Sequence, residues 1–175
     1  MSLENVALTG FMGSGKSTVG WLLAQQLEWT FIDVDREIET RFSCPASSLF
    51  HDLGEVAFRL IEAEVMAESL SLTRTVVALG GAAVDLPENQ KLLHSQYAGL
   101  LVFLDGDFDM LMNRCLREAD SEISTYRPLL RQREKALARF TARRQWNMTN
   151  AGVRINVESR SCGEISQEIA NYVKA

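Results

Sequence analysis

The chain has 175 residues, of which 46% are hydrophobic and 23% are charged, a composition typical of one globular domain spanning 1–175. The formal net charge of −5 argues against a general nucleic-acid binder, because such a protein needs a basic surface. The sequence has no CxxC pair, no signal-peptide pattern and no apolar run long enough to cross a bilayer. We therefore expect a cytoplasmic monomer that binds neither nucleic acid nor membrane.

Short apolar runs of β type alternate with segments of helical periodicity along the chain. The runs predict strands at 5–9, 30–34, 75–79, 99–104 and 153–157. The periodic segments predict helices at 16–27, 35–42, 56–70, 107–117, 134–147 and 164–174. This alternation predicts an α/β fold of right-handed βαβ units, with a parallel sheet covered by helices on both faces.

The first predicted strand and helix are joined by GFMGSGKS at 10–17, which matches the phosphate-binding pattern G-x-x-x-x-G-K-[ST]. In such a loop the backbone N–H groups face an anion, and the helix N-terminus adds partial positive charge. Lys16 is expected to reach the β- and γ-phosphates of a nucleotide, and the Ser17 hydroxyl is expected to ligate Mg²⁺. The other predicted nucleotide-binding residues of this segment are Gly13, Ser14, Gly15 and Thr18.

A regulatory GTPase is the main alternative from another functional class. It would carry a D-x-x-G switch and an N-K-x-D guanine reader, and neither string occurs in the sequence. A compact kinase for a small acceptor molecule remains as the better hypothesis.

Two carboxylates, Asp33 and Asp35, lie where the second predicted strand closes. Alternation along a strand places both on one side of the C-terminal sheet edge, where open α/β sheets bind ligands. One carboxylate could hold the hydration shell of Mg²⁺ while the other orients an acceptor hydroxyl. The alternative is a helix N-cap with an acid in the first turn.

Basic residues gather late in the chain, where seven of the 18 Lys and Arg residues fall between Arg127 and Arg144. Only Glu134 opposes them in this stretch. Such a run is either a solvated helix face or a local anion site in an otherwise acidic protein.

Six stretches of the chain resemble the shikimate kinase family in order and in approximate spacing. They are GFMGSGKSTVG (10–20), FIDVDREIE (31–39), LFHDLGEVAFRLIEAEV (49–65), VVALGGAAV (76–84), LVFLD (101–105) and RPLL (127–130). The resemblance implies a P-loop kinase fold, a three-layer α/β/α sandwich with a five-stranded parallel sheet and a lid at about 117–134. It also implies Mg²⁺-dependent transfer of the ATP γ-phosphoryl group to the 3-hydroxyl of shikimate, on the route to chorismate and the aromatic amino acids.

The resemblance assigns roles to individual residues of the catalytic centre. Asp33 corresponds to the acid near Mg²⁺, and Asp35 to the acid that contacts the acceptor hydroxyls and is the proposed base. Arg59 corresponds to the arginine that pairs with the shikimate carboxylate. Glu62, three residues later, could orient that arginine because it lies one helical turn away.

The resemblance assigns further roles around this centre. Gly80 and Gly81 correspond to the first two glycines of a turn whose backbone approaches the acceptor. Arg127 corresponds to a catalytic lid arginine that closes on the phosphates. Arg114 and Arg160 correspond to basic positions near the adenine.

Three features depart from the family pattern. The stretch after RPLL lacks the family's short Gly/Asp-containing loop, and the spacing to the next arginine site is shorter. Ala82 occupies the place of a third glycine, and if that place requires a positive φ, alanine there costs about 1 kcal/mol. An R-x-P-x-Y element is reduced to Arg143-Arg144-Gln145-Trp146-Asn147. Its spacing makes Arg143 the second carboxylate-binding arginine, with Arg144 as the alternative. Trp146 either covers the acceptor pocket or packs in the core.

Two other functions stay open at this point. One is a related small-molecule kinase with a shifted acceptor, such as a gluconate-kinase-like enzyme. The other is a shikimate-kinase-like protein that binds nucleotide but has lost catalysis. The second is disfavoured because the residues needed for the reaction are intact: Lys16, Ser17, Asp33, Asp35, Arg59 and Arg127.

Overall fold

A computed structural model describes residues 3–119 and 132–174 of the chain. The strands are β1 (Asn5–Thr9), β2 (Thr30–Asp33), β3 (Thr75–Ala78), β4 (Leu100–Asp105) and β5 (Val153–Asn156). They form one parallel sheet in the order β2-β3-β1-β4-β5. This confirms the predicted five-stranded parallel sheet.

The described α-helices are α1 (Lys16–Leu27), α2 (Val34–Phe42), α3 (Ala46–Leu70), α4 (Pro87–Lys91), α5 (Phe108–Ala119), α6 (Arg133–Asn150) and α7 (Cys162–Lys174). A 3₁₀ turn, η1 (Ala83–Asp85), and a π turn, η2 (Leu92–Gln96), complete the described elements. None of the described helices combines the length and the apolar character that crossing a membrane requires.

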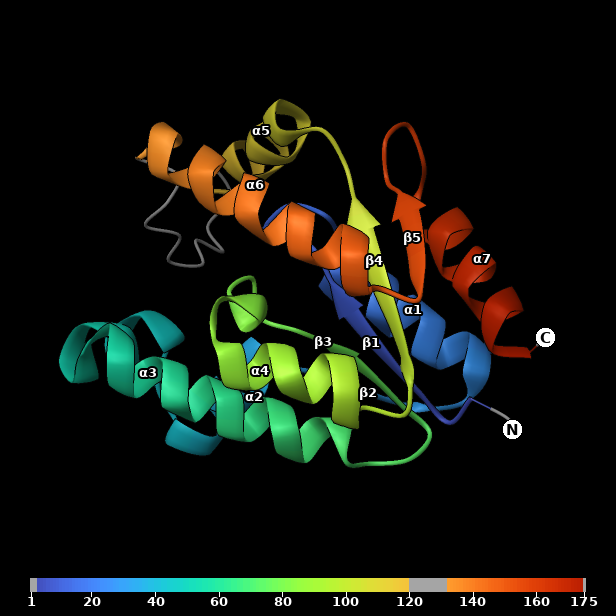
Figure 1. Cartoon of the computed structure of the whole chain (residues 1–175), viewed down its shortest axis with the longest axis horizontal. Helices are drawn as coiled ribbons and strands as arrows, with labels where there is room; N and C mark the ends of the chain where they lie inside the picture. The colour runs from blue at the N-terminus through green and yellow to red at the C-terminus, as the bar shows by residue number, and fades with distance from the viewer. Residues whose placement is uncertain (1–2, 120–131, 175) are drawn as a thin grey trace.

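Alternation along the central strand divides the core between the two faces of the sheet. Val6 and Leu8 of β1 point to the face that α1, α5 and α7 cover. Ala7, between them, points to the face that α2, α3 and η1 cover. Figure 1 shows α7 beside α1, and α3 and α4 beyond the sheet from them, which gives the three-layer α/β/α arrangement.

The sequence prediction and the structure differ in two segments. Helix α3 begins at Ala46, ten residues earlier than predicted, because it consists of two helical pieces joined by a kink at Gly54, whose φ of 80° and ψ of 166° are not helical. The predicted helix at 56–70 lies within the second piece. Between β3 and β4 the chain forms η1, α4 and η2, where no element was predicted. These elements are three to five residues long, which is too short for a helical periodicity to develop.

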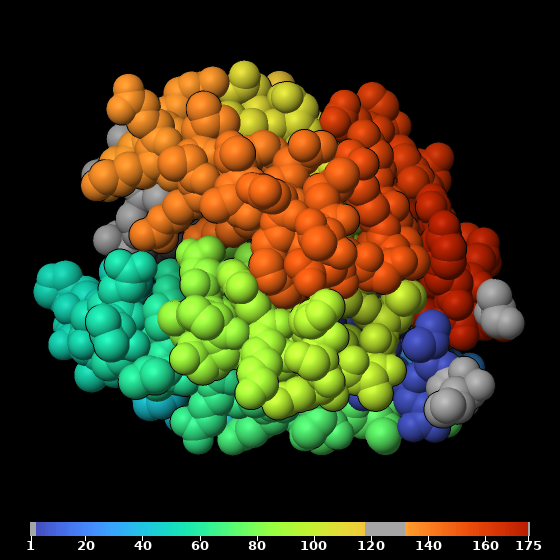
Figure 2. Space-filling model, in the orientation of Figure 1, coloured from blue at the N-terminus to red at the C-terminus, as the bar shows by residue number. Residues whose placement is uncertain are grey.

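The carboxyl ends of the parallel strands meet at one edge of the sheet, where ligands bind in open α/β folds. The phosphate loop follows β1, α2 follows β2, and the Gly80–Gly81 turn follows β3. Helix α6 contacts both β4 and η1. Figure 2 shows the side chains of α6 resting on those of the segment from η1 to η2.

Candidate active site

The phosphate loop has the backbone shape that its glycines allow. Gly13 and Gly15 have φ values of 76° and 89°, in the left-handed region that side chains disfavour. Lys16 begins α1, and its Nζ donates to the carbonyl oxygens of Gly10 (2.8 Å) and Phe11 (3.2 Å). The ammonium group therefore lies over its own loop, where a phosphate can replace the carbonyls as its partner.

The remaining loop residues differ in exposure. Ser14 is buried, and its hydroxyl has no hydrogen-bond partner among the described residues. Thr18 is exposed in the first turn of α1. Their assignment to the nucleotide site stays a prediction from the sequence motif.

The two arginines predicted near the adenine meet at the segment that follows β5. Arg114 of α5 donates from Nη2 to the carbonyl oxygen of Val157 over 3.2 Å. Arg160 lies three residues further along this segment and pairs with Glu168 at 2.7 Å. A side chain at Gly15 would lie 3.6 Å from Cys162 Sγ, so the phosphate loop borders the start of α7. The structure thus brings both arginines to the flank of the phosphate loop.

Ser17 at the start of α1 and Asp33 at the end of β2 bring two oxygen-bearing side chains together. Ser17 Oγ donates to Asp33 Oδ2 over 2.5 Å. A hydroxyl next to one carboxylate suits Mg²⁺, which takes few protein ligands and keeps phosphate oxygens and water for the rest. Among the described residues no cluster of three His, Cys, Asp or Glu side chains could hold a metal by itself. The residues present fit a metal shared with nucleotide phosphates.

The prediction that alternation along β2 aligns Asp33 with Asp35 is wrong. The strand ends at Asp33, whose Oδ1 caps α2 by accepting from the backbone N–H groups of Asp35 (3.2 Å) and Arg36 (3.4 Å). Asp35 lies in the first turn of α2. The alternative reading of the sequence, an N-cap followed by a first-turn acid, describes this local structure correctly. Both carboxylates nevertheless lie at the same sheet edge.

Asp35 has the largest shift of any carboxyl pKa in the described site. Desolvation, together with the negative charges of Glu62 and Asp33, raises its pKa from 3.8 to about 7, and Lys16 and Arg59 oppose the shift. Solvent reaches the Asp35 side chain, although protein atoms surround it closely enough for desolvation to be the largest cause. A carboxylate that titrates near neutral pH is suited to proton transfer.

Arg59 is held in place by Glu62 on the next turn of α3. Arg59 Nη1 donates to Glu62 Oε2 over 2.6 Å, and the Glu62 side chain is only 2% exposed. The guanidinium carbon lies 5.9 Å from the Phe50 ring centroid and 5.5 Å from that of Phe58. Glu62 therefore orients Arg59, as the helical spacing predicted, and two aromatic rings support the guanidinium from α3 itself.

The Gly80–Gly81 turn lies next to Asp35 and Glu62. A Cβ atom at Gly80 would collide with Glu62 Oε1 and lie 3.2 Å from Asp35 Oδ1, so a side chain there would displace the Glu62 carboxylate. A Cβ atom at Gly81 would meet nothing within 4 Å among the described residues. Ala82 has φ −109°, so the positive φ that would strain an alanine at this position is not present.

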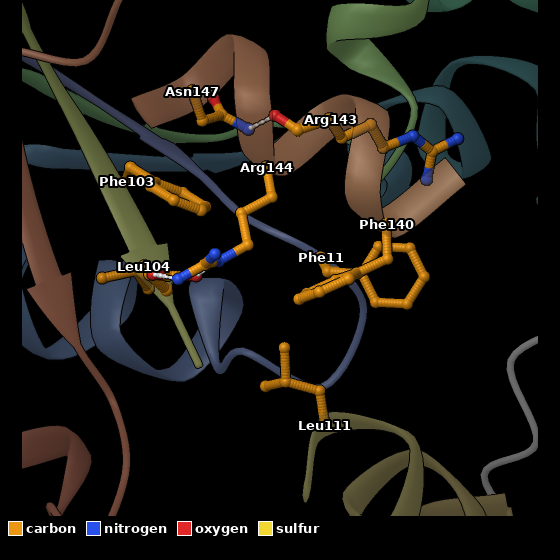
Figure 3. Close-up of a pocket in the computed structure, with 9 residues that line it drawn as sticks. Phe11, Phe103, Leu104, Leu111, Phe140, Arg143, Arg144 and Asn147 are labelled. Carbon is orange, nitrogen blue, oxygen red and sulfur yellow. Dashed lines mark hydrogen bonds and ion pairs between the residues drawn. The ribbon is translucent and has the colours of Figure 1, made fainter. Parts of the chain in front are cut away.

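Arg143 and Arg144 leave α6 in different directions (Figure 3). Arg143 pairs with Asp85 at the end of η1, through Nε at 2.7 Å and Nη2 at 2.5 Å. Arg144 pairs with Asp105 at the end of β4, at 2.8 and 2.9 Å, and Arg154 binds the same carboxylate. Only Arg143 is thus turned toward the segment that carries the Gly80–Gly81 turn.

Two polar residues near the site, Arg139 and Asp85, were not predicted from the sequence. Arg139 lies one turn before Arg143, and its Nη2 is 3.6 Å from Glu55 Oε1, which in turn lies 4.0 Å from Arg59 Nε. The four-residue spacing from Arg143 was a usable signal for Arg139. Asp85 gave no signal, because it lies in a segment where no element was predicted.

Two further expectations have different outcomes. Trp146 is partly buried against the core on the α2 and α3 face of the sheet, which agrees with the packing role. Arg127 and most of the predicted lid at 117–134 lie outside the described residues.

The family model for shikimate kinase matches residues 12–174. A shikimate kinase from Geobacter sulfurreducens is 38% identical over 173 residues, covering 98% of this chain and 91% of the relative. A shikimate kinase from Persephonella marina is 33% identical and covers 98% of this chain and 100% of the relative. The solved shikimate kinase from Acinetobacter baumannii in complex with shikimate is 28% identical, with a TM-score of 0.84 over 98% of this chain and 93% of that one. The chain belongs to the shikimate kinase family.

Proposed function

We propose that the chain transfers the γ-phosphoryl group of ATP to the 3-hydroxyl of shikimate, giving shikimate 3-phosphate and ADP. The observation that carries this proposal is that Asp35 lies near two cations, one in the phosphate loop and one on α3. Both Lys16 of the phosphate loop and Arg59 of α3 lower its pKa, so both lie within electrostatic range of its carboxylate. A group that can accept a hydroxyl proton is thus near both the lysine of a phosphate-binding motif and an arginine suited to bind a carboxylate.

On the nucleotide side, Lys16 and the N–H groups of the phosphate loop bind the β- and γ-phosphates. Ser17 and Asp33 would hold Mg²⁺, which neutralises charge on the phosphate oxygens when bound. Arg114 and Arg160 flank the adenine. These roles place the γ-phosphate at the sheet edge that Asp35 also occupies.

On the acceptor side, shikimate offers a carboxylate and several hydroxyls. The guanidinium fork of Arg59 matches a carboxylate bidentately, and Glu62 fixes the fork before the acceptor arrives. Arg143 is the better second arginine, since it pairs with Asp85 shortly after the Gly80–Gly81 turn, while Arg144 pairs with Asp105. Gly80 and Gly81 allow the acceptor ring to approach the backbone.

Asp35 orients the acceptor hydroxyl and takes its proton. The attacking oxygen must lie in line with the γ-phosphorus, and a carboxylate fixes that direction by accepting the hydroxyl hydrogen. A pKa of about 7 lets the same group take up the proton as the phosphoryl group is transferred.

A coupled assay of ADP release, run with shikimate, gluconate and no acceptor, tests the proposal. We expect turnover with shikimate alone, and mass spectrometry of the product should show one phosphoryl group on shikimate. Turnover with gluconate would indicate a shifted acceptor. ATP binding without turnover in any of the three would indicate a protein that has lost catalysis.

A further inference from the structure

The carboxylate of Asp85 occupies one edge of the Arg143 guanidinium. It accepts hydrogen bonds from Nε at 2.7 Å and from Nη2 at 2.5 Å. The Arg143 side chain is 8% exposed and the Asp85 side chain is 33% exposed, so the guanidinium is buried while solvent still reaches the carboxylate. Two short, parallel, charge-assisted bonds of this kind fix the orientation of a guanidinium as well as its position.

This arrangement leaves a second edge of Arg143 for another ligand. A guanidinium has five N–H donors in a planar fork, and Asp85 takes two of them. The two hydrogens on Nη1 and one on Nη2 remain, and within residues 3–119 and 132–174 no other group accepts a hydrogen bond from this side chain. Nη1 and Nη2 form an end-on pair whose geometry also matches a carboxylate.

Arg143 contacts both the phosphate loop and the segment that follows the Gly80–Gly81 turn. Its guanidinium carbon is 5.8 Å from the ring centroid of Phe11, a residue of the phosphate loop. In Figure 3 the Phe11 and Phe140 rings lie below the Arg143 side chain, which extends away from Arg144. The position suits a group that binds an acceptor beside the γ-phosphate.

Asp85 itself has a firm support. It ends η1, and its N–H donates to the carbonyl oxygen of Ala82 over 2.9 Å. Two side chains of α4 bind the carbonyl oxygens of the same turn, Asn89 to Ala83 at 2.9 Å and Gln90 to Val84 at 2.8 Å. The carboxylate is therefore fixed relative to the Gly80–Gly81 turn that precedes it in the chain.

We propose that Asp85 is a positioning residue, which holds the Nε edge of Arg143 so that the Nη1–Nη2 edge meets the acceptor carboxylate. The inference rests on the proposed function, because it takes Arg143 as a carboxylate ligand. Asp85 fixes the rotamer of Arg143 in advance, which reduces the conformational entropy that binding would otherwise lose. Since acceptor and Asp85 use different edges, Asp85 does not compete with the acceptor.

Asp85→Asn tests this role, because it keeps the size of the side chain and removes the charge that holds Arg143. We expect KM for shikimate to rise about tenfold, with kcat and KM for ATP unchanged. Asp85→Glu retains a carboxylate and should lie between the wild type and Asp85→Asn. A lower KM for shikimate in Asp85→Asn would show competition and overturn the proposal, as would an unchanged KM.

A double-mutant cycle with Arg143→Ala distinguishes the role of Asp85 from the assignment of Arg143 as a ligand of the acceptor carboxylate. If Asp85 acts through Arg143, adding Asp85→Asn to Arg143→Ala changes KM for shikimate no further. A rise in KM for Arg143→Ala but not for Asp85→Asn would refute the role of Asp85 alone. An unchanged KM in Arg143→Ala would refute the assignment of Arg143 and the inference with it.

Asp109→Asn is the matched control, since Asp109 also pairs with an arginine of α6, Arg133 at 2.6 Å, and both side chains are about 60% exposed. Its KM for shikimate should equal that of the wild type. Thermal unfolding of every variant checks that the protein is folded. Equilibrium binding of shikimate to folded Asp85→Asn gives the same answer without turnover: weaker binding supports the proposal, and unchanged binding overturns it.

Discussion

The hydroxyl of Ser17 donates a hydrogen bond to Asp33 Oδ2 across 2.5 Å, joining the start of α1 to the end of β2. Asp33 uses its other oxygen, Oδ1, to cap α2. One carboxylate therefore serves both a predicted metal site and a helix N-terminus. A substitution by asparagine distinguishes these two roles, because asparagine caps a helix about as well as aspartate but is a poorer ligand for Mg²⁺.

Asp33→Asn should therefore raise the Mg²⁺ concentration needed for half-maximal activity while leaving the melting temperature nearly unchanged. Titration of kcat/KM against Mg²⁺ at fixed ATP measures the effect. Ser17→Ala, which removes the other oxygen, should shift the titration in the same direction. An unshifted Mg²⁺ titration in both variants would contradict the metal assignment.

Lys16→Ala should reduce kcat by at least about 10²-fold, since it removes a preorganised cation from the phosphates. The two carbonyl oxygens that Nζ contacts belong to its own loop, so the melting temperature should change little. Lys135→Ala, an exposed residue of α6, is the control. Near-normal turnover in Lys16→Ala would overturn the assignment of the phosphate loop.

The sheet and the phosphate loop could be predicted from the sequence because both depend on contiguous patterns. Strand β1 reads as an apolar run, and the motif at 10–17 needs only its own glycines and the next helix. Whether Asp35 belongs to the strand or to the following helix could not be predicted in this way. It depends on where β2 ends, and that is decided by the capping bonds of Asp33.

The Asp85–Arg143 pair lay beyond sequence reasoning for a different reason. Its members are 58 residues apart, and they meet only because α6 packs across η1. Ala82 is a second case, because the sequence does not show whether its place requires a positive φ, and the backbone there has φ −109°. Local patterns predict local structure, whereas the partners of a charged side chain follow from the packing of distant elements.

Arg59→Lys should raise KM for shikimate about tenfold or more, because lysine keeps the charge but loses the fork and its bond to Glu62. KM for ATP should change little, since the lost contact is with the bound acceptor. Arg41→Lys is a suitable control, as Arg41 pairs with Glu37 and Glu68 on the surface. A fall in ATP affinity instead would assign Arg59 to the nucleotide site.

The activity should depend on pH through Asp35. Its pKa is raised to about 7, so kcat/KM for shikimate should fall as the pH drops below about 7 and the carboxylate takes up a proton. Glu62→Gln removes one of the negative charges that raise this pKa. The fall in kcat/KM at low pH, the acid limb of the pH profile, should therefore move to lower pH. Glu55→Gln should leave it in place, because Glu55 is not among the groups that shift Asp35. A limb unaffected by Glu62→Gln would show that another group controls it.

Asp35→Asn tests the mechanism most directly. The substitution keeps the size and some hydrogen bonding but removes the proton acceptor and the charge that orients the hydroxyl. We expect kcat to fall about 10²-fold or more, the range in which general bases contribute. ATP binding should survive because the phosphate loop is untouched. Near-normal kcat would refute the role of Asp35.

The stability of Asp35→Asn should depend on pH in a direction that the pKa shift fixes. The pKa is about 7 in the folded state against an ordinary value of 3.8, so folding disfavours the ionised carboxylate. This cost is complete above about pH 7, shrinks as the pH falls below 7, and is absent below about 3.8. The variant should therefore melt above the wild type at pH 8, by a margin that is smaller at pH 5. The difference in melting temperature between variant and wild type could be equal at both pH values, or the wild type could be more stable at pH 8. Either result would show that the surroundings of Asp35 do not oppose its negative charge. A positive result would mean that the site gives up stability for a base that titrates near neutral pH.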